Sequence, residues 1–143
     1  MFKILEANEL TTNIYQMIVE APRVASACLP GQFLIIRVDE EGERIPLTIC
    51  DYNREKGTVE IVAQAIGAET YKLSKLKAGD ELADVVGPLG KPSDLCEMSV
   101  DELKKKKIVF IAGGVGTAPV YPQAKYLKEH GVDCDVIIGA KTK

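Results

Sequence analysis

A run of apolar residues ends in glycines and then in proline between Ile108 and Pro119, in the order Ile-Val-Phe-Ile-Ala-Gly-Gly-Val-Gly-Thr-Ala-Pro. Continuous apolar residues are typical of a strand covered on both faces in a parallel sheet. Glycine has no Cβ, so glycine backbone comes close to a ligand. Proline suits the first turn of a helix, where its missing N–H is not needed. The stretch therefore predicts a strand, a glycine loop and a helix N-terminus, which together favour an anion.

The spacing of these glycines partly matches the dinucleotide-binding pattern G-x-G-x-x-G. Gly114 and Gly116 match its first two glycines, and Pro119 replaces the third. No acidic residue ends the next apolar run to hold a ribose, and Lys141 lies there instead. No Gly-Lys-Ser/Thr follows, which disfavours a nucleoside triphosphatase. Two interpretations remain, a plain tight turn and a nucleotide site made of Gly113, Gly114, Gly116, Thr117 and Pro119.

The residues around the glycines predict one β-α-β unit. The first strand covers 108–112, and a helix over 118–129 carries Tyr121, Ala124 and Leu127 on one stripe. Gly131 suits a helix C-cap, and 136–138 forms a second buried strand. Two parallel strands do not make a covered sheet by themselves. We therefore expect the sequence to be cut short.

The first 90 residues read as short strands separated by turns, at 14–19, 32–38, 44–50, 58–63 and 81–86. Pro46 inside one of them requires an edge, a bulge or a ligand beside it. Several short strands at this spacing predict a mainly β fold, an antiparallel barrel or sandwich, followed by an incomplete α/β segment. We expect a barrel domain over 1–97, a linker with a short helix over 98–107 and a nucleotide-binding fragment over 108–143.

Composition excludes several classes of protein. The 143 residues carry a net charge of −3, which argues against nucleic-acid binding. No apolar run reaches the roughly 20 residues that span a bilayer, and no export signal is present, so we expect a cytoplasmic protein without a membrane segment. The four cysteines lack paired spacing and there is one histidine, so no metal site is predicted in this chain.

The order of five segments resembles the ferredoxin-reductase superfamily, in which an antiparallel flavin barrel precedes a nicotinamide domain. These segments are 30–33, 44–48, 67–70, 87–90 and 113–119. The resemblance implies a mainly β fold, an antiparallel Greek-key flavin-binding barrel followed by an incomplete α/β segment with a single β-α-β unit. More narrowly, the chain is similar to the small subunits of NADH-dependent ferredoxin:NADP oxidoreductase, also called sulfide dehydrogenase. The electron-transfer subunits of dihydroorotate dehydrogenase are close relatives. The most specific match is the segment 113–125. The resemblance covers the whole of this chain, which corresponds to about the first half of such a subunit.

The resemblance implies a role for each segment. Arg44 would pair with the FAD pyrophosphate, and Thr48 would stand near flavin N5 as the catalytic residue. Pro46 and Leu47 would pack on the cofactor. A helix N-terminus at Gly67, Glu69 and Thr70 would lie under the FAD phosphates, although relatives often have glycine in place of Glu69. Residues along the isoalloxazine edge would be Ile61, Val62, Ala63 and Gln64.

The resemblance also implies cofactors and partners. FAD would pass electrons between NAD(P)H and an iron–sulfur centre, with [2Fe–2S] expected only in the missing C-terminal part. The partner would be a larger flavin and iron–sulfur oxidoreductase subunit. The alternative is a non-catalytic truncated product, a folded barrel whose β-α-β arm self-associates through its open sheet edge as a homodimer.

Overall fold

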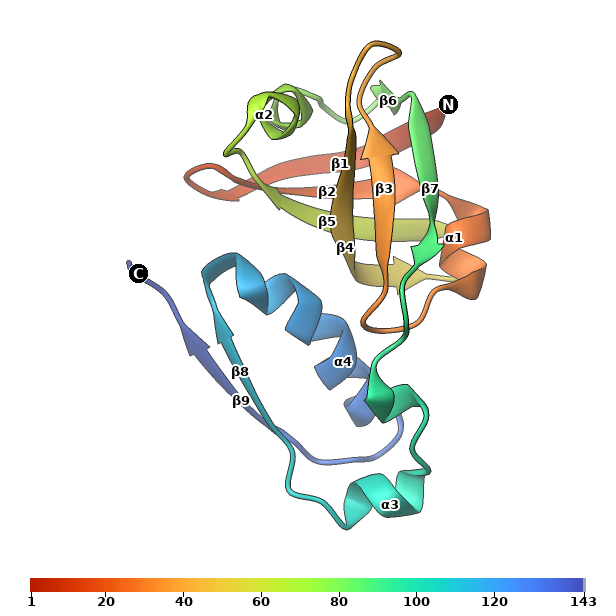
Figure 1. Ribbon diagram of the computed structural model, residues 1–143, viewed down its shortest axis with the longest axis vertical. Coiled ribbons are helices and arrows are strands. Elements are labelled where there is room, and N and C mark those ends of the chain that lie inside the picture. Colours follow the sequence, from red (N-terminus) through yellow and green to blue (C-terminus); the bar gives the residue numbers. More distant parts are fainter. Residues whose placement is uncertain (143) are drawn as a thin grey trace.

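Seven strands in the first 90 residues form one antiparallel sheet that curls into a nearly closed barrel (Figure 1). The structure is a computed structural model that describes residues 1–142. The strand order is β6-β1-β2-β5-β4-β3-β7. The strands are β1 (Phe2–Thr11), β2 (Ile14–Glu20), β3 (Phe33–Arg37), β4 (Arg44–Asn53), β5 (Thr58–Gln64), β6 (Glu81–Leu82) and β7 (Asp84–Leu89).

The connections have the Greek-key pattern. Hairpins join β3, β4 and β5, and β2 reaches its place beside β5 by a longer connection through helix α1 (Pro22–Ala27). Only Ala83 separates β6, which pairs with β1, from β7, which pairs with β3. The two ends of the sheet therefore meet at this corner, and the predicted mainly β barrel is confirmed.

Alternating apolar side chains fill the barrel. Leu34 and Ile36 on β3 are completely buried, and they pack with Ile4 of β1 and Leu82 of β6. Helix α1 adds Ala25 to this core, and helix α2 (Ala68–Ser74) adds Leu73.

Pro46 occupies an open edge of β4. Residues 44–48 of β4 pair with β3, whereas pairing with β5 begins at Ile49. The Ile49 N–H donates to Gln32 O on the β3 side, so strand alternation directs the Pro46 nitrogen to the opposite, unpaired side. The missing N–H therefore removes no ladder hydrogen bond, as the edge alternative for this proline requires.

The remaining residues form the predicted β-α-β unit. Its elements are η1 (Asp94–Cys96), α3 (Val100–Lys104), β8 (Val109–Gly113), η2 (Gly114–Gly116), α4 (Thr117–Glu129) and β9 (Asp135–Gly139), with β8 and β9 parallel. Ser99 caps α3 by accepting a hydrogen bond from the Glu102 N–H at 3.2 Å. Gly131 follows α4 with a φ of +70°.

The burial predicted for this unit is wrong in two respects. Ile111 of β8 is 76% exposed and Ile137 of β9 is 57% exposed, because one helix covers only one face of a two-stranded sheet. On α4 the buried residues are Ala118, Pro122 and Leu127, whereas Tyr121 is about half exposed. In the residues described, no helix has the length and apolar character needed to cross a bilayer.

Candidate functional site

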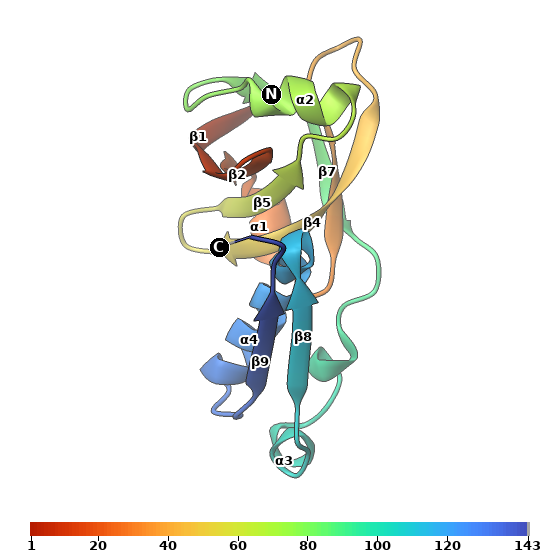
Figure 2. The ribbon, with the colours of Figure 1, turned by 90° about the vertical axis from the view of Figure 1, so that its left-hand side faces the viewer.

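An open cleft of about 1450 Å³ lies where the barrel meets the β-α-β unit. Strands β8 and β9 both run toward the barrel, so their C-terminal ends and the start of α4 face it (Figure 2). The glycine loop and the end of β9 line one wall, while β2, β4, β5 and the tip of the β1–β2 hairpin line the other. The cleft therefore joins segments from both parts of the chain.

Backbone forms much of the wall on the β-α-β side. Gly114 has a φ of +55°, a conformation that glycine adopts readily. A Cβ built on Gly114, Gly116 or Gly139 would meet no atom within 4 Å. Helix α4 begins directly after the loop, and Thr117 also lines the cleft. Free N–H groups and the positive end of the α4 dipole thus face open space, as an anion site requires.

The barrel wall is built from alternate residues of β5. Val62 and Gln64 line the cleft, whereas Ile61 and Ala63 point into the barrel core. Of the four residues predicted along the flavin edge, two therefore face this cleft. Beside them, Gln16 Nε2 donates to Glu60 Oε1 at 2.5 Å.

Residues predicted on β4 lie on two different faces. Leu47 is opposite the buried Leu34 and packs against the barrel core. Arg44, Pro46 and Thr48 alternate with it and share the outer face of the strand. None of these four residues lines the cleft between the two units. The structure therefore separates Pro46 from Leu47 and groups Pro46 with Arg44 and Thr48.

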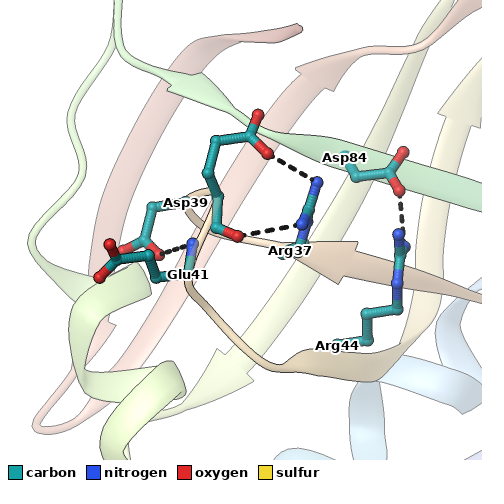
Figure 3. Close-up of polar contacts among 6 residues, drawn as sticks. Arg37, Asp39, Glu41, Arg44 and Asp84 are labelled. Carbon is teal, nitrogen blue, oxygen red and sulfur yellow. Dashed lines mark hydrogen bonds and ion pairs between the residues drawn. The ribbon is translucent and has the colours of Figure 1, made fainter.

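The Arg44 guanidinium already has an acidic partner. Its Nη1 lies 2.6 Å from Asp84 Oδ2 of β7, across the neighbouring strand β3 (Figure 3). This charge-assisted hydrogen bond lowers the pKa of Asp84. The Arg44 side chain remains half exposed. A phosphate could reach it from solvent, but it would compete with Asp84.

Thr70 acts as a local cap at the start of α2. Its Oγ1 accepts hydrogen bonds from the N–H groups of Ile66 at 3.1 Å and Gly67 at 3.0 Å. The hydroxyl donates to Gly67 O at 3.1 Å. These contacts occupy the hydroxyl, so what this turn presents outward is the backbone of 67–70.

Glu69 points away from the α2 N-terminus, toward the hairpin between β3 and β4. The residue is 9% exposed, and its Oε1 lies 3.0 Å from Lys72 Nζ. Lys72 also reaches Asp39 Oδ2 in that hairpin at 3.3 Å. A Cβ built on Gly42 would stand 2.7 Å from Glu69 Oε2. The Glu69 carboxylate is therefore buried against the hairpin and does not stand in front of the α2 N-terminus.

Sequence reasoning missed Cys50, which lines the cleft. A register shift between Ile49 and Asp51 marks a β-bulge at this cysteine. Burial raises the pKa of the Cys50 thiol to about 12, with the charges of Glu60 and Asp51 adding to the effect. The thiol is therefore neutral and weakly nucleophilic near pH 7. The sequence carries no signal for the bulge.

The cysteines do not converge on a metal site. All four are free, and Cys28 and Cys50 are buried. Within residues 1–142, histidine, cysteine and acidic side chains form no group that could hold a metal ion. His130 ends α4 with its Nδ1 2.7 Å from Tyr126 O.

A Greek-key barrel followed by a β-α-β unit, with a glycine loop across the intervening cleft, defines the ferredoxin-reductase-like fold. The solved NADH-dependent reduced ferredoxin-NADP oxidoreductase matches 100% of this chain with a TM-score of 0.89 and 38% identity, over 49% of that chain. Phthalate dioxygenase reductase shares the fold with a TM-score of 0.70 at 18% identity, over 99% of this chain and 43% of that one. No family model matches the chain.

Curated relatives agree with this fold. The dihydroorotate dehydrogenase B electron transfer subunit homolog of Thermotoga maritima is 38% identical over 99% of this chain and 48% of its own length. An uncharacterized protein encoded in the adh 3' region of Clostridium beijerinckii is 57% identical over 100% of this chain and 48% of its own length. The chain is thus homologous to these electron-transfer subunits, and the resemblance noted from its sequence is confirmed. It spans about half the length of the curated relatives that it matches.

Proposed function

We propose that this chain forms the FAD- and NAD(P)H-binding half of an electron-transfer subunit that works with a larger flavin and iron–sulfur oxidoreductase. One observation carries the proposal: glycine backbone at a helix N-terminus faces the barrel across an open cleft. The named relatives and the close structural match support the same function. When bound, FAD would accept a hydride from the nicotinamide and release single electrons to a [2Fe–2S] centre outside these residues.

The glycine loop would hold the nucleotide. N–H groups of 114–117 and the α4 dipole favour the diphosphate of NAD(P)H, and the open space over Gly114 and Gly116 leaves room for it. Thr117 would add a hydroxyl, and Pro119 fixes the first turn of the helix. Gly113 ends β8 and brings this loop to the cleft. Val62 and Gln64 would form the facing wall.

The outer face of β4 would hold FAD. Arg44 would exchange its contact with Asp84 for the FAD pyrophosphate, a bidentate anion that suits a guanidinium. Thr48, on the same face, would offer its hydroxyl to the flavin ring, and Pro46 would pack between them. Leu47, Ile61 and Ala63 would support this face from the barrel core. The backbone at 67–70 would receive phosphate, with Glu69 held aside by Lys72.

Reconstitution with FAD tests the proposal. We expect the full chain to bind FAD, read as quenched flavin fluorescence and a shifted flavin absorbance band. Arg44→Ala removes a charged hydrogen-bond donor and should raise the FAD Kd about ten- to a hundredfold. Asp84→Asn releases the arginine and should leave the Kd equal or lower. Arg23→Ala, on the distant α1 surface, is the matched control. A wild-type chain that stays apo at saturating FAD would rule the function out.

The exposed side chains of β8 and β9 favour a second candidate, a non-catalytic chain that self-associates through this sheet. Ile111, Ile137 and Ile138 together leave apolar area uncovered on and beside an open edge. Sedimentation at increasing protein concentration separates the candidates. A concentration-dependent dimer lost on Ile137→Lys, in a protein that does not take up FAD, would favour this second candidate.

A further inference from the structure

Two polar contacts attach α4 to the barrel, one directly and one through Ser93 in the segment that follows β7, and neither belongs to the proposed binding sites. Lys125 Nζ lies 2.8 Å from Asp51 Oδ1 of β4. Ser93 Oγ donates to Gln123 Oε1 at 2.8 Å. Both α4 residues stand between the glycine loop and the end of the helix. The contacts therefore control how the helix that carries the loop lies against the barrel.

The fold aims Asp51 at this helix. The β-bulge between Ile49 and Asp51 interrupts the pairing of β4 with β5, and a bulge re-aims the side chains around it. Asp51 Oδ1 also accepts a hydrogen bond from the Tyr52 N–H at 2.8 Å, which fixes the carboxylate. The hydrogen bond that Lys125 donates to Asp51 raises the pKa of Lys125, so this lysine stays charged at physiological pH. No other charged partner of Lys125 lies within ion-pair distance in residues 1–142.

The second contact continues into the first turn of α4. Ser93 is held against the barrel because its N–H donates to Pro30 O at 2.7 Å. A Cβ built on Gly31 would come within 2.7 Å of Ser93 N, so the two segments touch there. Gln123 Nε2 donates to Pro119 O at 3.0 Å. This chain of contacts links the barrel turn at Pro30 to the helix turn that follows the glycine loop.

We propose that Asp51, Lys125 and Gln123 are positioning residues that hold the glycine loop at a fixed separation from the barrel wall. They thereby set how closely a bound nicotinamide approaches a bound flavin; this role rests on the proposed function. Hydride transfer needs its reacting atoms about 3–3.5 Å apart, and a displacement of about 1 Å lowers the rate about a hundredfold. A contact outside both binding sites can therefore act on the rate without acting on FAD affinity.

Hydrogen exchange on the full chain without cofactor tests the attachment. Asp51→Asn and Lys125→Met each remove one charge of the pair, and amides over 121–127 should then exchange about fivefold faster, the size expected for a partly exposed ion pair. The charge-swapped variant Asp51→Lys/Lys125→Asp should restore slow exchange. Lys128→Met, three residues along α4 at an exposed position, is the control. Exchange in both single variants that matches this control would overturn the proposal.

Stopped-flow flavin reduction tests the positioning role in the FAD-loaded chain. At saturating NADH or NADPH the reduction rate should fall about tenfold in Asp51→Asn and Lys125→Met, while the FAD Kd stays within about twofold. The charge swap should recover the rate. FAD-binding variants with faster exchange but an unchanged rate would overturn the positioning role alone. A wild-type chain that binds no FAD would instead overturn the proposed function, and the positioning role with it.

Discussion

The barrel and the β-α-β unit both contain strands of apolar residues, but the barrel buries them and the β-α-β unit leaves many of them exposed. Every main strand of the barrel contributes to one buried apolar cluster, and its sheet meets itself at Ala83. In the second unit the fully buried cluster consists of Leu103, Leu127 and Val132, and one face of β8–β9 lies open (Figure 1). Apolar residues alone do not make a core, because closure of the sheet decides how much of their surface is buried from water.

The comparison implies that the two units differ in their independence. The barrel encloses its own core, which contains no residue of α4, so we expect it to fold without that helix. The β-α-β unit rests on the barrel through α4 and buries little by itself, so we expect its order to depend on that contact. Four predictions test this difference, from the largest effect to the smallest.

Dividing the chain should give the largest effect. A fragment of residues 1–97 should unfold cooperatively on heating, because it retains the whole barrel cluster. A fragment of residues 98–143 should show no cooperative transition, because two strands and one covering helix bury too little apolar area. Circular dichroism melts of both fragments and the full chain measure this. A sigmoidal melt of the second fragment would contradict the argument.

Single truncations in the two sheets should differ by several kcal/mol. Leu34→Ala empties a completely buried site in β3 and should lower the free energy of unfolding by about 2–5 kcal/mol. Ile111→Ala, on the open face of β8, should change it by no more than about 0.5 kcal/mol. Urea unfolding gives both values. Ile36→Val should lower the free energy of unfolding by about 0.5–1.5 kcal/mol, which checks that a smaller truncation in the barrel has a smaller effect.

Alkaline pH should destabilise the barrel through its buried thiols. Burial raises the pKa of Cys28 to about 11 and that of Cys50 to about 12, from a usual value near 9. Because the folded pKa values are the higher ones, this stability is complete below pH 9 and is lost as pH rises to 11–12. The loss approaches about 1.4 kcal/mol per pH unit for each thiol.

Urea unfolding at pH 7.5, 9 and 10 should reveal this loss in the wild type. In the Cys28→Ala/Cys50→Ala variant the free energy of unfolding should change less with pH over the same range. Cys96 and Cys134, in the second unit, are partly exposed. They should therefore react with a thiol reagent in the native protein before the two barrel cysteines do. Equal labelling of all four would contradict the difference in burial.

Arg54→Ala should have the smallest effect of the four. The Arg54 guanidinium donates to the carbonyl oxygens of Ala25, Ser26 and Cys28 at 2.9, 2.6 and 2.9 Å, at the end of α1. Its loss leaves these carbonyls to water and should lower the free energy of unfolding by about 1–2 kcal/mol. Arg54→Lys should recover only part of this, because one ammonium does not span the same acceptors. Thermal melts against Arg23→Ala, an exposed arginine on α1, give the comparison.

Much of the barrel could be predicted because short apolar segments and turns such as Pro30-Gly31 are local signals. Strand β1 was not predicted, since its charged residues hide the alternation. Helix α1 was not predicted either: Pro22 reads as a stop for the preceding strand, but it also begins a six-residue helix. The break between β6 and β7 depends on barrel closure at Ala83, which no local pattern encodes.

In the candidate site, too, the features with a local sequence signal could be predicted and those that depend on the fold could not. The glycine loop is a local motif, and the structure brings it to a cleft that Val62 and Gln64 also line, whereas its role in nucleotide binding stays a prediction. The contact between Asp51 and Lys125 joins residues 74 positions apart and needs a bulge to form, so sequence spacing could not predict it. The roles of Arg44, Thr48 and Thr70 stay predictions.

The close approach of Gly42 to the Glu69 carboxylate makes the tolerance of one position depend on the other. With glutamate at 69, a methyl group at 42 would stand 2.7 Å from the Glu69 carboxylate, so the glutamate side chain must shift to admit it. Once 69 becomes glycine, the nearest atom to the same methyl group is Asp39 Oδ1 at 3.1 Å, a milder contact. A substitution at 69 therefore relieves the tightest contact of a new side chain at 42, and a library built at position 42 alone would underestimate what this surface can become.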